Sequence, residues 1–116
     1  MVANVLVGLV ALIHVYILVL EMFLWERPYG RRVFNTTPEF AAASKVLAAN
    51  QGLYNGFLAA GLVWGLWLGM PGRPVQLFFL ACVFVAGVYG AITATRRILW
   101  AQAVPAAVAA AAVVWS

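Results

Sequence analysis

Four long apolar stretches, separated by short polar breaks, constrain this chain more than any other feature of its sequence. The breaks hold most of the charged residues and fall at residues 26–39, 70–74 and 95–97. A membrane hydrocarbon layer about 30 Å thick is crossed by roughly 20 mostly apolar residues in a helix. The sequence therefore predicts four membrane-spanning helices, at about residues 5–25, 44–69, 74–95 and 98–115.

The composition favours a membrane protein over a soluble domain. Hydrophobic residues make up 66% of the 116 residues and charged residues only 9%, a balance typical of membrane proteins. The apolar stretches lack the alternating pattern of a membrane-spanning strand, so helices must satisfy the backbone hydrogen bonds in lipid. We expect an all-α polytopic membrane protein, a four-transmembrane-helix bundle that forms one integral membrane domain over residues 1–116.

A cleaved signal peptide is the alternative interpretation of the first apolar stretch. Such a peptide begins with basic residues and ends at a site of small residues. The first four residues, MVAN, contain no Lys or Arg, and the stretch ends in EMFLWERP. We therefore expect the first helix to be retained.

Positive charges are distributed unevenly between the two sides that this topology defines. Six of the seven Lys and Arg residues fall on one side, and the seventh, Arg73, falls on the other. Cytoplasmic loops of membrane proteins carry such an excess of positive charge. The sequence predicts a multi-pass membrane protein with both termini outside the cytoplasm. The six residues are Arg27, Arg31, Arg32, Lys45, Arg96 and Arg97.

Polar residues of all four predicted helices gather near the cytoplasmic side. Glu21 lies six residues before Arg27, which corresponds to roughly 9 Å along a helix. We predict a polar intramembrane pocket at this depth, centred on Glu21. Its candidate ligand-binding or proton-binding residues are Glu21, His14, Asn50, Gln51, Tyr54, Asn55, Tyr89, Thr93 and Gln102.

Glu21 is the most informative of these residues, and three interpretations of it stay open. A carboxylate inside a membrane costs about 2.5 to 3.5 kcal/mol on insertion scales. Glu21 could lock helices together by pairing with Arg96 or Arg97, or by accepting hydrogen bonds from Gln51 or Asn55. It could instead be a protonatable or cation-binding group. A side chain that reaches back to the membrane boundary is the third interpretation.

His14 shares one helical stripe with Leu18, Glu21 and Trp25, because these positions recur at about 100° per residue. A lone His cannot build a multi-ligand metal site within one chain. Either a hydrogen bond to another helix or a role as proton relay or substrate contact would explain it. Two interpretations are kept for the polar residues of the second helix: they form interhelical hydrogen bonds, or they line a water-accessible pocket. These residues are Asn50, Gln51, Tyr54 and Asn55.

Small residues on the second helix predict close helix packing. Gly52 and Gly56 form one pattern, and Gly61, Gly65 and Gly69 form another on a different face. We expect one pattern to pack within the monomer and the other to serve a dimer.

Threonine and proline residues predict local features at two places along the chain, a helix cap and a helix distortion. Thr36 or Thr37 can cap a helix whose first turn contains Pro38 and Glu39. Pro105 is expected to distort the fourth helix and to free a carbonyl near Ala101.

Catalytic constellations are not recognisable in this sequence. No Ser/His/Asp set, paired catalytic carboxylates or phosphate-binding loop can be assembled, and Cys82, the single cysteine, is expected to be a small buried side chain. We therefore predict no catalytic residues, no metal site and no cofactor.

Three segments resemble the signature of a known family. They are HVYILVLEMFLW at residues 14–25, NQGLYNGFLAAGL at residues 50–62, and GVYGAITATRR in the third stretch. The chain resembles a family of small bacterial integral membrane proteins known only as a domain of unknown function. The resemblance implies a four-helix inner-membrane protein and no particular activity.

Three functional hypotheses follow. The first is a membrane protein that binds or moves a small cationic or protonated ligand, with Glu21 carrying the charge, by analogy with small multidrug transporters. The second is a structural or accessory subunit of a larger membrane complex. The third is a small membrane enzyme or redox module acting on a lipid or quinone. Expected partners are the lipid bilayer, a second copy of the chain and a small-molecule ligand, and no nucleic acid.

Overall fold

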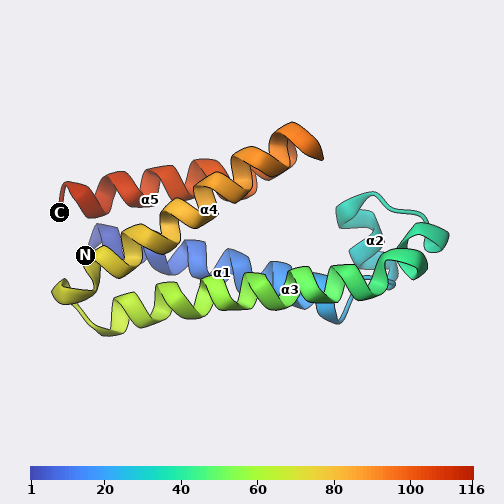
Figure 1. Cartoon of the computed structure of the whole chain (residues 1–116), viewed down its shortest axis with the longest axis horizontal. Helices are drawn as coiled ribbons and strands as arrows, with labels where there is room; N and C mark the ends of the chain where they lie inside the picture. Colours follow the sequence, from blue (N-terminus) through green and yellow to red (C-terminus); the bar gives the residue numbers. More distant parts are fainter. The chain divides into compact units, whose positions relative to one another are not determined.

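A computed structural model describes the whole chain, Met1–Ser116, which contains helices and no strands. A short 3₁₀ turn, η1 (Met70–Gly72), precedes α4 (Arg73–Thr93), and a π-helical turn, η2 (Leu99–Ala103), runs directly into α5 (Val104–Val114). The prediction of an all-α protein is confirmed. The α-helices are α1 (Val2–Met22), α2 (Pro28–Phe34), α3 (Pro38–Trp67), α4 (Arg73–Thr93) and α5 (Val104–Val114) (Figure 1).

Two helical stretches are long and apolar enough to cross a membrane, Val2–Met22 and Met70–Thr93, and Leu99–Val114 is a shorter apolar helix. α3 is longer than either stretch, at 30 residues. The first half of α3 carries the polar residues Lys45 and Asn50. α3 is not one of the two helices with both the length and the composition of a membrane span. Of the four predicted spans, two thus have both the length and the composition of a membrane helix.

The chain forms two compact units, which we describe separately. Unit 1 consists of Met1–Ile13 and Leu58–Ser116, and unit 2 consists of His14–Phe57. α1 and α3 each contribute one part to each unit.

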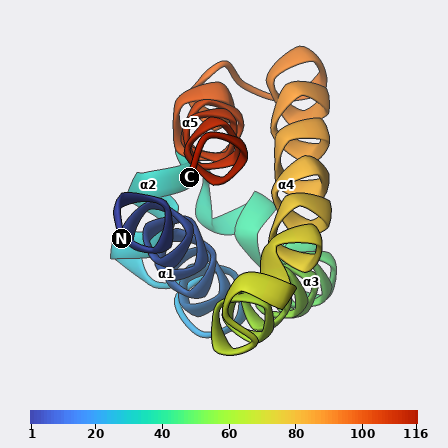
Figure 2. The ribbon, with the colours of Figure 1, turned by 90° about the vertical axis from the view of Figure 1, so that its left-hand side faces the viewer.

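Four helices supply the apolar core of unit 1. α4 and α5 run side by side (Figures 1 and 2), and both chain termini lie at the same end as the turn before α4 (Figure 1). Alanine and valine dominate the core, so the helix backbones can pack closely. Its buried residues are Ala3, Val7, Val10, Ala11, Leu62, Leu80, Val83, Ala106, Ala109 and Val113.

The distortion predicted at Pro105 is confirmed and takes the form of the π-helical turn η2. Proline has no backbone N–H, and its ring clashes with the carbonyl four residues earlier in a regular α-helix. Here the Val104 N–H bonds to the carbonyl of Leu99, five residues back. The wider turn makes room for the proline ring at the start of α5.

In unit 2, the polar break at residues 26–39 contains a short helix, α2, that no sequence pattern predicted. Pro28 begins α2, where its missing N–H costs nothing. Asn35 ends α2 in the left-handed conformation, with φ of 55°. The Phe40 N–H then donates to Thr37 Oγ1 at 3.1 Å, which confirms the predicted cap of α3.

The first helix ends three residues earlier than predicted, at Met22. The N–H groups of Phe23 and Leu24 both bond to the Val19 carbonyl, which closes the helix. Trp25 therefore leaves the stripe predicted for it. Its Nε1 donates to Ser44 Oγ at 3.1 Å, and its ring packs on Phe34 with centroids 5.0 Å apart.

Candidate functional site

Glu21 and Asn55 are candidate residues that the structure brings into direct contact. Asn55 Nδ2 donates to Glu21 Oε1 at 2.7 Å and also lies 3.1 Å from the Gln51 carbonyl oxygen, as a second acceptor. Both side chains are half-buried. The bond joins the last turn of α1 to the middle of α3. One of the hydrogen-bond partners expected for Glu21 is therefore observed.

Glycines on α3 allow the close approach that this bond requires. A Cβ atom at Gly52 would lie 2.6 Å from Met22 Cγ and 3.1 Å from Glu21 Cβ, and one at Gly56 would lie 2.6 Å from Leu18 Cδ1. The closer restriction is at Gly52, where a Cβ atom would also lie 3.2 Å from the Leu18 carbonyl oxygen. Asn55 lies three residues after Gly52, on the same side of the helix, which places its amide against α1.

The second glycine pattern faces α4 within unit 1. A Cβ atom at Gly61 would collide with the Phe79 ring, and one at Gly65 would lie 2.7 Å from Gln76 Cγ. Both patterns therefore pack against helices of the same chain, so the assignment of one pattern to a dimer is wrong. A homodimer itself remains a prediction. Gly69 has a different role, since it ends the helical region with φ of 71°.

Glu21 lies nearer to the end of its helix than the sequence suggested. The expected depth of roughly 9 Å assumed helical geometry as far as Arg27. Because α1 ends at Met22, Glu21 occupies the last turn, directly before the non-helical link to α2.

The other candidate residues differ in exposure. His14 is fully buried, and Gln102 is half-buried. The remaining five are exposed, and Tyr54 and Tyr89 retain 59% and 68% of their accessible surface. Thr93 Oγ1 donates to the Tyr89 carbonyl at 2.8 Å, within α4. The exposed candidates are Asn50, Gln51, Tyr54, Tyr89 and Thr93.

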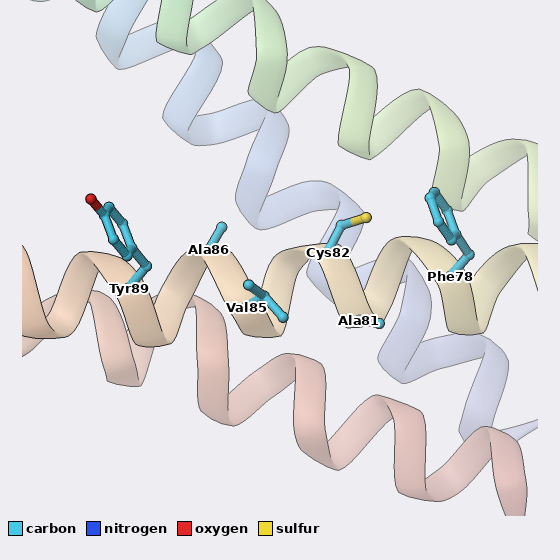
Figure 3. A pocket seen from close by; sticks show the side chains of 6 residues that line it. All are labelled: Phe78, Ala81, Cys82, Val85, Ala86 and Tyr89. Atoms are coloured by element: carbon cyan, nitrogen blue, oxygen red, sulfur yellow. The ribbon is translucent and has the colours of Figure 1, made fainter.

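A shallow apolar groove follows one face of α4 (Figure 3). It contains Tyr89 but no other candidate residue. All of its lining residues belong to one helix. Cys82 is half-buried in this groove rather than fully buried as predicted. The lining residues are Phe78, Ala81, Cys82, Val85, Ala86 and Tyr89.

Sequence reasoning missed a polar network in unit 1. Gln76 is fully buried, and its Nε2 donates to the Gly65 carbonyl at 3.0 Å. Arg73 Nη1 donates to Gln76 Oε1 at 2.8 Å and to Asn4 Oδ1 at 3.1 Å. The network links α1, α3 and α4. The three-residue spacing of Arg73 and Gln76 at the start of an apolar stretch was the available signal, because such residues share a helix face.

These features define a small all-α protein with apolar helices of membrane-spanning length and a carboxylate–amide pair between two helices. The chain belongs to the family described as "Protein of unknown function (DUF1304)", whose family model matches residues 8–114. The resemblance to a family of unknown function is therefore confirmed.

The chain is also similar to a bacterial protein. The chain is 32% identical over 96 residues to the uncharacterized protein YpaA of Lactococcus lactis subsp. lactis (strain IL1403), which covers 81% of each protein. No solved structure matches the chain.

Proposed function

We propose that this chain is a multi-pass inner-membrane protein that binds a proton or a small cation at Glu21, with Asn55 as the positioning residue. The observation that carries the proposal is the 2.7 Å hydrogen bond from Asn55 Nδ2 to Glu21 Oε1. It holds a half-buried carboxylate at a defined place between α1 and α3.

The chemistry of the pair leaves the carboxylate able to take a ligand. Asn55 is a neutral partner, whereas the ion pair of unit 2 joins Glu26 to Lys45 at 3.4 Å. A carboxylate has about four acceptor positions, and Asn55 uses one of them. A half-buried charge without an opposite charge is costly. A proton or a bound cation would remove that cost.

The arrangement of unit 1 supports the proposed topology. Both termini lie at the end of α4 that carries Arg73 (Figure 1). Arg96 and Arg97 follow the other end of α4, about 30 Å away along a helix of 21 residues. With Arg96 and Arg97 on the cytoplasmic side, both termini would lie outside the cytoplasm.

A structural subunit is the second candidate function, and the same contact favours it. The Glu21–Asn55 bond and the Gly52 contact would also lock α1 against α3 permanently. In that role the carboxylate needs no ligand. The two candidates therefore differ in whether the charge of Glu21 matters.

Glu21→Gln is expected to weaken binding of tetramethylammonium, a small organic cation, at least tenfold, while the melting temperature changes little. The Gln amide oxygen can still accept the hydrogen bond from Asn55, so the variant removes the charge and keeps the contact. Isothermal titration calorimetry of the detergent-solubilised full chain measures the affinity, and native mass spectrometry counts the bound cations.

Glu39→Gln is the matched control, because Glu39 is an exposed carboxylate in the first turn of α3. It should bind the cation as the wild type does. Equal binding by the wild type and Glu21→Gln, with unchanged melting temperature, would contradict the cation site and favour the structural subunit.

A further inference from the structure

We propose that Arg27 and Arg32, at the exposed surface of unit 2, bind the headgroups of anionic phospholipids. This inference goes beyond the Glu21 site and uses different residues. It concerns the segment between α1 and α3, which contains α2.

The four cationic side chains of unit 2 differ in whether they form a hydrogen bond or an ion pair with Glu26. Lys45 Nζ lies 3.4 Å from the Glu26 carboxylate, so its charge is paired within the chain. Arg31 is half-buried, and its Nε donates to the Glu26 carbonyl at 3.2 Å. Arg27 and Arg32 are exposed and form no ion pair with a carboxylate of unit 2. These two guanidinium groups are therefore available to bind an anion that does not belong to the chain.

An aromatic ring contacts Arg32, and two further aromatic rings of unit 2 are exposed. The Arg32 guanidinium carbon lies 5.8 Å from the centre of the Tyr29 ring, a cation–π contact that leaves its N–H groups free to donate. Phe23 and Phe40 are 68% and 56% exposed. Tyr29 is itself exposed, and tyrosine rings are enriched at membrane–water interfaces.

Contacts with α1 and with the link that follows it hold α2 in a fixed position. The hydroxyl groups of Tyr16 and Tyr29 are hydrogen-bonded, and the Trp25 ring packs on Phe34. Gly30 is buried against the Leu24 carbonyl, where any side chain would collide. Arg27 and Arg32 are therefore presented at the end of α1, one of the helices with membrane-spanning length.

The chemistry of this surface fits a ligand with an anionic and an apolar part. Guanidinium groups form charge-assisted hydrogen bonds with phosphate oxygens, often in pairs. Phe23 and Phe40 would contact the acyl region beside the headgroup. A phospholipid of net negative charge, such as phosphatidylglycerol, provides both parts, whereas a free phosphate provides only one.

The test measures binding of phosphatidylglycerol and phosphatidylcholine to the full chain in detergent, by native mass spectrometry. We expect preferential binding of phosphatidylglycerol. Arg27→Gln combined with Arg32→Gln should weaken it roughly 25-fold, because each surface cation contributes roughly fivefold. Lys45→Gln should leave the affinity within about twofold, since Lys45 is already paired.

A charge-preserving variant separates electrostatics from folding. Arg27→Lys with Arg32→Lys should retain most of the preference, and Glu21→Gln should retain all of it, which distinguishes this proposal from the Glu21 site. Equal affinity for the two lipids, or wild-type affinity in the double Gln variant, would overturn it. Competition by millimolar inorganic phosphate would also overturn it, since that result identifies a site for free anions.

Discussion

Gly87→Ala is expected to lower the melting temperature of the solubilised protein by roughly 5–10 °C. A Cβ atom at Gly87 would lie 2.6 Å from the backbone nitrogen of Ala103 and 3.0 Å from its Cα. Backbone atoms cannot move aside as a side chain can, so α4 and η2 must separate. Overpacking of this kind costs about 1–3 kcal/mol. Circular dichroism during heating measures the change.

Gly8→Ala is the matched control for this prediction. Gly8 also lies within a helix, but a Cβ atom there would have nothing within 4 Å. Alanine favours helices over glycine by about 1 kcal/mol, so the melting temperature should stay constant or rise. Equal behaviour of the two variants would contradict the close packing of α4 against η2.

Gln76→Leu is expected to reduce the free energy of unfolding by roughly 3 kcal/mol, because it removes a buried hydrogen-bond network. Leucine has a similar size but can neither donate to the Gly65 carbonyl nor accept from Arg73. The Arg73 guanidinium would keep only the bond to Asn4. Denaturant titration, followed by tryptophan fluorescence, measures the loss.

Gln51→Leu makes the same chemical change on an exposed side chain of α3. A substitution of this kind usually alters the free energy of unfolding by less than 0.5 kcal/mol in either direction. If both Leu variants unfolded at the same denaturant concentration, Gln76 would not hold the helices of unit 1 together.

Together, these two stability tests concern unit 1, whereas the cation and lipid tests concern unit 2. A failure of either binding proposal would leave the packing predictions intact. Conversely, a lower melting temperature of the Gly87 variant does not test whether the charge of Glu21 binds a cation. The proposals can therefore be judged one by one.

Local sequence signals identified several elements correctly. Long apolar stretches located α1 and α4, Thr37 marked the start of α3, and Pro105 marked the distorted start of α5. Each signal acts over a few residues, through hydrogen bonding of a cap or the missing N–H of proline. α2 was not predicted, because a seven-residue helix is too short for a periodic apolar pattern.

The candidate site was only partly predictable. Glu21 stood out because a carboxylate in an apolar stretch is costly, and Asn55 was one of four partners considered for it. Gln76 was overlooked, although it is the buried polar side chain that links α3 and α4. The spacing of Arg73 and Gln76 shows that both lie on one helix face, but it does not show which helix that face meets.

The sequence by itself determined that this chain is helical and that apolar segments dominate it, because hydropathy and capping are local properties. The tertiary structure alone decided that Asn55 holds Glu21, that both glycine patterns pack within the chain, and that Gln76 is buried while Gln51 is exposed. These outcomes depend on which helix faces meet. That choice is made by the fit of side chains from distant parts of the chain, which no local pattern records.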